Sequence, residues 1–223
     1  MKIFAVIPAY NEAEVIKQVV NSISNMVDEV IVVDDGSSDQ TFCLAIESGA
    51  KTLRHFLNRG QGAALQTGID FALRMGADII VTYDADGQFI PEEIEKIIKP
   101  LLLGECDICL GSRFLDDKSK IPKIKKTVLK FAVLVTRIYT GLSVTDTHNG
   151  FRALSEKAAR LIIIKQDKMA HASEILEQVK KHNLKFKEIP VTVKYTDYSL
   201  QKGQKISNSF KIIRDLIISR VTR

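Results

Sequence analysis

Short apolar runs rich in β-branched residues recur along the first half of the chain, and helical spacing of apolar residues follows them. The runs are KIFAVIP from Lys2, EVIVVDDGS from Glu29, ADIIVTYDADG from Ala77 and CDICLGSRF from Cys106, with a shorter one at 51–55. Such unbroken runs are typical of strands buried on both faces. Strands alternating with helices predict an α/β protein with a mainly parallel, doubly wound, Rossmann-like sheet and helices on both faces.

After Phe114 the pattern changes and predicts more helix than strand. The elements expected there are a basic amphipathic helix at 124–139, helices ending near Ile164 and His182, a strand pair around 185–195 and a basic amphipathic helix at the C-terminus. No repeat, low-complexity tract or linker divides the 223 residues. The sequence therefore predicts one domain, 1–223, with functional halves at 1–114 and 115–198 and a basic segment at 199–223.

Positive charge is concentrated in two segments of the second half. The net charge is +5, and the stretch from Lys118 to Arg137 holds seven basic residues and no acid. The last turns add six cations against one acid, Asp215. This asymmetry predicts an anionic partner such as phosphates or a lipid surface, whereas either stretch alone could be a solvated helix face. Nucleic acid is not expected, because no aromatic stacking platform accompanies the charge.

Targeting signals are not evident in the sequence. No apolar run approaches the roughly 20 residues that a membrane-spanning helix needs. Pro8 interrupts the N-terminal apolar run too early for a signal peptide, and three cysteines do not make a disulfide framework. We therefore expect a protein that begins in the cytoplasm.

The strongest motif is Asp84-Ala85-Asp86-Gly87-Gln88 at the end of a predicted buried strand. Alternate residues of an extended chain point the same way, so both carboxylates can approach one ion. Carboxylate and amide oxygens suit a hard divalent cation, and the motif predicts Mg²⁺ or Mn²⁺ held by Asp84, Asp86 and Gln88. The alternative is a polar turn in which Asp86 caps the next helix.

Two polar turns after other predicted strands are weaker signals. Asp35 can bind a ribose hydroxyl or a base edge, or it can belong to a plain turn. Gly60 and Gly62 resemble the start of a dinucleotide fingerprint, but Leu65 replaces its third glycine and no Walker lysine follows. A close approach of this backbone to a phosphate or a base remains open.

Five motifs occur in a fixed order along the chain. They are IPAYNE from Ile7, VDDGS from Val33, NRGQG from Asn58, DADGQ from Asp84 and GSR from Gly111. Together they resemble family 2 glycosyltransferases of the GT-A fold, particularly the dolichyl-phosphate mannose synthase and polyprenyl-phosphate glycosyltransferase group. The resemblance implies an inverting, metal-assisted enzyme that moves a hexose from a UDP- or GDP-linked donor to a polyprenyl phosphate, as in cell-envelope polysaccharide synthesis.

The resemblance also implies roles for individual residues. Donor binding would fall to Pro8, Tyr10, Glu12, Asp35, Gly60 and Asp84, in the half 1–114. The metal ligands would be Asp84, Asp86 and Gln88. The acceptor phosphate would be bound by Arg113, Lys123, Lys126, Lys202 and Lys205. The catalytic candidates are Asp86, Arg113 and Asp146.

The loop 146–152 would complete the sugar pocket. A lipid phosphate is already ionised and needs no general base, whereas a sugar hydroxyl needs one, and Asp146 is the candidate. His148 could contact the sugar or be an ordinary loop histidine, and the ordinary interpretation is favoured.

Many members of the group carry C-terminal transmembrane helices that this sequence does not show. We therefore expect a cytoplasmic protein, peripheral on the cytoplasmic face of the membrane. Its terminal helix would meet lipid, a small membrane-protein partner or its own domain. The alternative functions are transfer to a saccharide or glycolipid hydroxyl, nucleotidyl transfer, and non-catalytic nucleotide binding as the partner of a membrane protein.

Overall fold

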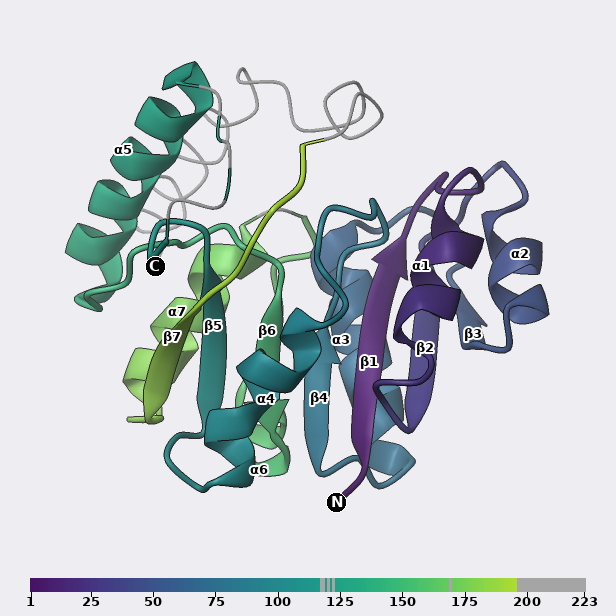
Figure 1. Ribbon diagram of the computed structural model, residues 1–223, viewed down its shortest axis with the longest axis horizontal. Coiled ribbons are helices and arrows are strands. Elements are labelled where there is room, and N and C mark those ends of the chain that lie inside the picture. The colour runs from purple at the N-terminus through teal and green to yellow at the C-terminus, as the bar shows by residue number, and fades with distance from the viewer. Residues whose placement is uncertain (117–118, 120, 122, 169, 196–223) are drawn as a thin grey trace.

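A seven-stranded sheet forms the centre of the computed structural model, which describes residues 1–116, 119, 121, 123–168 and 170–195 (Figure 1). The side chains of 123–125 and 139 are not among those described. The strands are β1 (Ile3–Ala9), β2 (Glu29–Asp34), β3 (Lys51–Arg54), β4 (Ile79–Thr82), β5 (Ile108–Ser112), β6 (Arg152–Ser155) and β7 (Phe186–Pro190). Their order across the sheet is β3-β2-β1-β4-β6-β5-β7.

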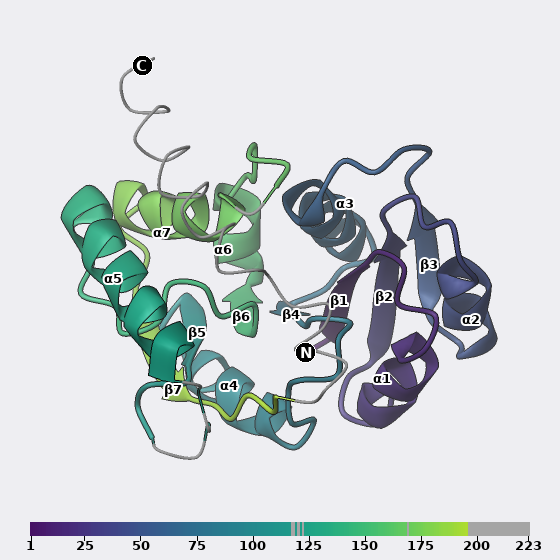
Figure 2. The ribbon, with the colours of Figure 1, turned by 90° about the horizontal axis from the view of Figure 1, so that it is seen from above.

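Helices cover both faces of the sheet (Figure 2). They are α1 (Ile16–Ile23), α2 (Thr41–Glu47), α3 (Gln61–Arg74), α4 (Glu93–Leu102), α5 (Lys123–Thr140), α6 (Glu156–Leu161) and α7 (His171–Lys181). Alternate residues of β1 enter different cores: Ile7 packs with α1 and α4, and Val6 with α3, α6 and α7. The predicted α/β class, with a mainly parallel sheet between two helical layers, is confirmed.

The strand β6 is the exception to parallel pairing, since it runs antiparallel to both β4 and β5. Thr82 of β4 lies opposite Arg152 of β6. Because the two strands run in opposite directions, the residues that precede Arg152 lie beside those that follow Thr82. The hydroxyl of Thr82 donates to the carbonyl of Gly150 at 2.6 Å. The loop 146–151 is thereby brought to the sheet edge where β1 and β4 end.

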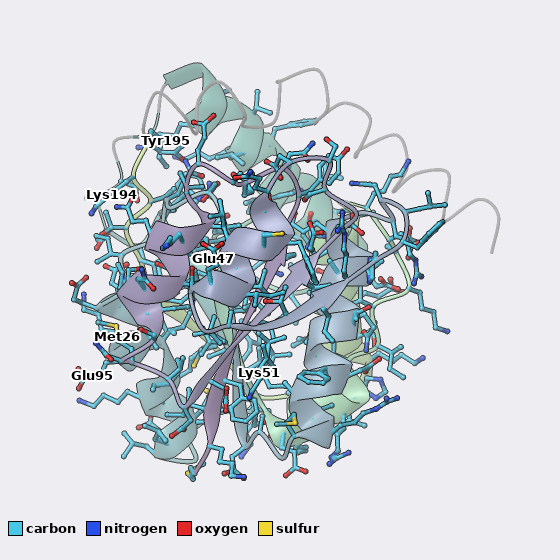
Figure 3. All side chains as sticks on the ribbon, turned by 90° about the vertical axis from the view of Figure 1, so that its right-hand side faces the viewer. Met26, Glu47, Lys51, Glu95, Lys194 and Tyr195 are labelled. Atoms are coloured by element: carbon cyan, nitrogen blue, oxygen red, sulfur yellow. The ribbon has the colours of Figure 1, made fainter. Side chains whose placement is uncertain are left out.

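The predicted strand pair at 185–195 is only partly correct. A single strand, β7, occupies 186–190, and Val193 then forms an isolated bridge with Phe89. The chain leaves the sheet there because the amide of Lys194 donates to the carbonyl of Gln88 at 2.8 Å. Lys194 and Tyr195 consequently lie at the end of the molecule where α5 stands (Figure 3).

The predicted basic loop and terminal helix, 199–223, lie outside the described residues, and so do Lys202 and Lys205. None of the helices in the described part of the chain is long and apolar enough to cross a membrane.

Helix α3 lies close against the sheet because Gly68 has no side chain. A Cβ at this position would overlap Cγ1 of Val6 on β1 and lie 3.2 Å from Cγ2 of Val33 on β2. All three residues are buried. The contact fixes the distance of α3 from the sheet, and the first turn of α3 borders the site described below.

Replacing Gly68 with alanine should therefore destabilise the fold by roughly 1–3 kcal/mol, since overpacking moves α3 from the sheet. In an exposed helix the same change would stabilise by about 1 kcal/mol. Chemical denaturation measures the difference in the free energy of unfolding between variant and parent. Adding Val6→Ala to the Gly68→Ala chain should recover part of the lost stability. A Gly68→Ala protein as stable as the parent would contradict this packing.

Candidate active site

A cavity of about 390 Å³ opens where β1, β2 and β4 end. It brings together nine of the predicted residues: Pro8, Tyr10, Glu12, Asp35, Gly60, Asp84, Asp86, Gln88 and Arg113. The carboxyl ends of parallel strands meet at one edge of a sheet, which is why motifs far apart in sequence converge there. Gln61, for which no role was predicted, and His148, for which a sugar contact was one of two alternatives, also line the cavity.

Asp84 is held at the middle of this cavity by its neighbours. A Cβ at Gly150 would collide with both carboxylate oxygens, so only glycine lets the loop 146–151 pass this close. Nε2 of Gln61, the first residue of α3, donates to Oδ1 of Asp84 at 3.0 Å. Burial raises the pKa of Asp84, and the guanidinium groups of Arg152 and Arg113 oppose that rise.

Arg152 supplies positive charge beneath the cavity. It is 3% exposed, and its Nη1 has no hydrogen-bond partner among the described residues. Burial lowers the pKa of Arg152 to about 10, while Asp84 and Asp146 favour its charged form. The buried cation and the two carboxylates therefore compensate one another. The sequence placed Arg152 at the end of the loop 146–152 near the sugar pocket, but it did not predict the strand β6 that buries this residue.

Asp86 and Gln88 complete the acidic turn. The amide of Gln88 donates to Oδ1 of Asp86 at 3.0 Å, and Nε2 of Gln88 donates to the carbonyl of Lys194 at 3.0 Å. Within the described residues no cluster of three His, Cys, Asp or Glu side chains could hold a metal ion. Two carboxylates and one amide oxygen nevertheless fit Mg²⁺ or Mn²⁺, which take oxygen ligands from substrate and water as well.

Arg113, which follows β5, forms a buried ion pair with Asp146. Its Nε lies 2.6 Å from Oδ2 and its Nη2 lies 3.4 Å from Oδ1. Burial disfavours the charge on Arg113, but Asp146 outweighs it and raises the pKa of the guanidinium. Glu188 of β7 fixes the loop by accepting from the amide of Thr145 at 2.7 Å. Asp146 is not among the described residues that line the cavity. Its contact with Nε of Arg113 holds that guanidinium in place.

A second cavity, of about 210 Å³, lies on the other side of Arg113. Its lining includes Lys126 and Lys130, one turn apart on α5, together with Ser119. Two predicted phosphate-binding residues, Arg113 and Lys126, are thus brought together. Lys130 was missed, although its i+4 spacing from Lys126 could have indicated it. Lys123 begins α5, but its side chain is not described.

Asp35 forms the opposite end of the first cavity and is 3% exposed. Oδ1 accepts from the amide of Arg59 at 3.0 Å and lies 2.7 Å from Nδ1 of His55. Oδ2 accepts from the amide of Gly60 at 2.6 Å. Nε2 of His55 lies 2.9 Å from the hydroxyl of Thr67 on α3. Asp35 is therefore part of a fixed network within the protein, and its role in donor binding stays a prediction.

Gly60, which precedes α3, and Gly62, in its first turn, serve chain packing. A Cβ at Gly60 or Gly62 would overlap the backbone carbonyl of Asp167 or Gln166. The amide of Gly62 donates to the carbonyl of Asp167 at 2.8 Å, and that of Gly60 is taken by Asp35. These two amides consequently already have partners within the protein. Gly60 still lines the cavity, as predicted for a donor-binding residue.

Two histidines near Arg152 are held neutral by their surroundings. Burial, with Arg113 and Arg152, lowers the pKa of His148 to about 4 despite Asp146. Its Nδ1 lies 2.7 Å from the hydroxyl of Thr147, and His148 lines the cavity. A sugar contact by this residue stays a prediction. Burial and Arg152 likewise lower the pKa of His171 to about 4.

The family of the chain follows from comparison with known proteins. A model described as glycosyl transferase family 2 matches residues 4–163. This protein belongs to glycosyl transferase family 2. The predicted family and the prediction of an enzyme are thereby confirmed. Relatives similar to this glycosyltransferase along most of its length are known in archaea and bacteria.

Two of these relatives have named activities. The UDP-N-acetylglucosamine–dolichyl-phosphate N-acetylglucosaminyltransferase of Methanococcus voltae is 34% identical, over 98% of this chain and 96% of its own. The polyprenol monophosphomannose synthase of Mycolicibacterium smegmatis is 30% identical, over 87% of this chain and 77% of its own. A third, an uncharacterized protein of Methanocaldococcus jannaschii, is 39% identical over 99% of this chain and 93% of its own.

Among solved structures, glucosyl-3-phosphoglycerate synthase from Mycobacterium tuberculosis, in complex with Mg²⁺ and UDP, has a TM-score of 0.76. It is 22% identical and covers 99% of this chain and 78% of its own. At that identity the likeness shows a shared fold.

The neutral state of His171 predicts a pH dependence of stability. In the unfolded chain a histidine binds a proton near pH 6.5, but in the folded protein only near pH 4. The contribution of His171 to the free energy of unfolding is therefore complete above pH 6.5. It is lost as the pH falls towards 4, and the loss amounts to at most about 3 kcal/mol. Chemical denaturation at several pH values should show this decrease in the free energy of unfolding.

His171→Gln should make the fall smaller, because glutamine can still donate to the carbonyl of Lys168, 2.7 Å from Nδ1 of His171, without titrating. His182→Gln, at the end of α7, is the matched control and should leave the pH profile as in the parent. An unchanged profile in His171→Gln would contradict the assignment.

Proposed function

We propose that this glycosyltransferase moves a hexose from a nucleoside diphosphate sugar to a polyprenyl phosphate, with inversion at the anomeric carbon. Two cavities that share Arg113 support it: the lining of the first includes Asp84 and Asp86, and the lining of the second includes Lys126 and Lys130 beside one acid, Asp116. The names of the two relatives include dolichyl phosphate in one case and polyprenol monophosphomannose in the other. Residues 1–114 would form the donor half and 115–198 the acceptor half of a single domain.

On the donor side, the residues that end β4 would meet the diphosphate. Asp84, Asp86 and Gln88 would hold Mg²⁺ or Mn²⁺, which would stabilise negative charge on the departing nucleoside diphosphate. Solved structures of the same fold are complexes with Mg²⁺ or Mn²⁺ and UDP. The contacts of Asp84 with Gln61 and Gly150 keep its carboxylate in place before the donor arrives.

On the acceptor side, Arg113, Lys126 and Lys130 would bind the phosphate of the lipid. A guanidinium fork suits phosphate oxygens, and Asp146 fixes its direction from behind. An oxygen of the bound phosphate would attack the anomeric carbon opposite the leaving group, and the bond between that carbon and the diphosphate oxygen would break. The acceptor oxygen already carries negative charge, so no residue has to remove a proton.

A hydroxyl acceptor with Asp146 as base is less well supported. Both oxygens of Asp146 face Arg113, and Oδ1 also accepts from the amide of His148 at 3.3 Å. A base must instead present an oxygen to the acceptor hydroxyl. Replacing Asp146 would also leave Arg113 buried and unpaired, so a loss of activity would be expected under either hypothesis.

The outer face of α5 supports attachment to a membrane surface. Phe131, Leu134 and Ile138 are 54%, 53% and 74% exposed, and their spacing places them on one side of the helix. Lys126 and Lys130 lie beside this apolar stripe, at the second cavity. In Figure 1, α5 stands at the end of the sheet to which β1 points. We propose that α5 lies in the lipid interface on the cytoplasmic side, where the acceptor phosphate is reached.

Incubation with Mn²⁺, a panel of labelled hexose donors and polyprenyl phosphate should give a product that extracts into organic solvent. Asp84→Asn and Asp86→Asn should each lower turnover at least about a hundredfold, because a charged ligand of the ion is lost. Asp70→Asn, on the exposed side of α3, is the matched control and should retain activity. No lipid-linked product with any donor would defeat the proposal.

The protein should bind vesicles that contain anionic lipid, and co-sedimentation measures this binding. Substituting serine at Phe131, Leu134 and Ile138 together should weaken binding about tenfold or more, since exposed apolar area drives insertion. Phe56→Ser changes a side chain that is 98% exposed at the opposite edge of the sheet and should have no effect. If the triple variant still binds vesicles, membrane attachment belongs to another surface. The apolar face of α5 would then be assigned to a protein partner.

A further inference from the structure

The loop between α6 and α7 lies against the start of α3 and is held there by hydrogen bonds. Oε2 of Glu174, a side chain that is 8% exposed, accepts from the amides of Lys165 at 2.9 Å and Gln166 at 2.8 Å. The carbonyl of Asp167 accepts from the amide of Gly62 at 2.8 Å. The backbone of this loop therefore has a fixed place beside the first turn of α3.

Lys168 follows in this loop and lies against Gly60. Its carbonyl is 2.7 Å from Nδ1 of His171, which fixes its backbone. A Cβ added at Gly60 would lie 3.1 Å from Cγ of Lys168, so the stem of the lysine contacts a glycine that lines the first cavity. The lysine is exposed, and the neighbouring acid, Asp167, is paired with Arg59 at 3.7 Å. Within the described residues no ion pair engages Lys168 itself.

Gly60 lies between two acidic parts of the first cavity. Its amide donates to Oδ2 of Asp35 at 2.6 Å, and the next residue, Gln61, donates through Nε2 to Oδ1 of Asp84 at 3.0 Å. A donor that has its diphosphate at Asp84 and extends along the cavity towards Asp35 must therefore pass Gly60. The phosphate that carries the ribose would come nearest to this glycine.

The charges around the first cavity leave a diphosphate short of positive partners. Its described lining holds the carboxylates of Glu12, Asp35, Asp84 and Asp86 and one guanidinium, that of Arg113. A divalent cation and the diphosphate of a donor would nearly cancel each other, which leaves the carboxylates in excess even when the buried Arg152 is counted. Because like charges repel, a further cation would stabilise the complex with the donor.

The N-terminus of α3 does not supply this positive charge. Free amides at a helix N-terminus commonly bind phosphate. Here the amides of Gly62 and Ala63 donate to the carbonyl of Asp167 at 2.8 and 3.3 Å. The residue after Asp167 is Lys168, so the segment that occupies the start of the helix also brings a cation to it.

We propose that Lys168 is a donor-binding residue whose ammonium binds the phosphate that carries the ribose. This inference rests on the proposed function and adds a cation to the donor side of the site. An ammonium is a point charge on a flexible stem, so Nζ can turn from solvent to a phosphate oxygen over Gly60 when a donor binds. The contact strengthens binding of the diphosphate and does not affect binding of the nucleoside alone.

Calorimetric titration of the full chain with UDP and GDP, each with Mn²⁺, and with uridine and guanosine tests this contact. Lys168→Met keeps the stem that lies against Gly60 and removes the charge. Affinity for the nucleoside diphosphate that the parent binds should fall about tenfold or more, since a charge-assisted hydrogen bond is lost. Affinity for the nucleoside should stay the same. Added salt should weaken diphosphate binding less in Lys168→Met than in the parent.

Two further variants separate charge from structure. Lys168→Arg keeps a cation at this position and should retain most of the affinity for the diphosphate. Lys165→Met is the matched control, because it removes another exposed lysine from the same loop, and it should bind the diphosphate as the parent does. Chemical denaturation should give all three variants the parental free energy of unfolding, since both lysines are exposed.

Diphosphate affinity that is unchanged in Lys168→Met, or that falls equally for the nucleoside, would overturn the inference. An equal loss in Lys165→Met would overturn it too. If the parent glycosylates polyprenyl phosphate and Lys168→Met has the same KM for the donor, the inference fails and the proposed function remains. Weaker diphosphate binding in Lys168→Met, with no lipid-linked product from the parent, would support the contact and reject the acceptor. If the parent binds no nucleoside diphosphate, both fail.

Discussion

The ion pair between Arg113 and Asp146 is the contact on which the rest of the site depends. It joins the end of β5 to the loop before β6, and both side chains are at least nine-tenths buried. A buried charge is stable only when it is paired, and removal of one partner typically costs about 3–5 kcal/mol. Because Asp146 supports it from behind, Arg113 can border two cavities at once. A single guanidinium thus borders both cavities.

Charge compensation extends from this pair across the floor of the site. Arg152 lies beneath Asp84 and Asp146, and its charge opposes the burial that raises the pKa of Asp84. The same positive charge helps to keep His148 and His171 neutral. The buried cations and acids are therefore interdependent. Removing one of them would be expected to change the protonation of several neighbours.

The antiparallel strand β6 makes this arrangement possible. Inserted between β4 and β5, it carries Arg152 under the cavity and returns the loop 146–151 to the sheet edge. Gly150 then passes against the carboxylate of Asp84, where any side chain would collide. A parallel strand in this place would have put the preceding loop at the opposite edge. The direction of one short strand therefore determines which residues lie beside Asp84 at the first cavity.

The sequence by itself determined the α/β class, the family and the set of residues at the sheet edge. These follow from local patterns, because a buried apolar run followed by acids must end in a polar turn. The carboxyl ends of parallel strands then lie at the same edge of the sheet. Asp35, Asp84, Asp86 and Arg113 were found in this way. The end of the described chain proved to be one strand and a bridge instead of a strand pair.

Only the tertiary structure decided which atoms of those residues are already engaged. Asp146 contacts Arg113 across 33 positions of sequence, and Asp35 accepts from amides 24 and 25 positions away. Such pairings depend on strand order and on the path of loops, which no local pattern encodes. The physical reason is that a carboxylate has few acceptor positions, and their use depends on every segment packed around it. Residue type sets what a group can bind, and the fold sets how much of that capacity remains.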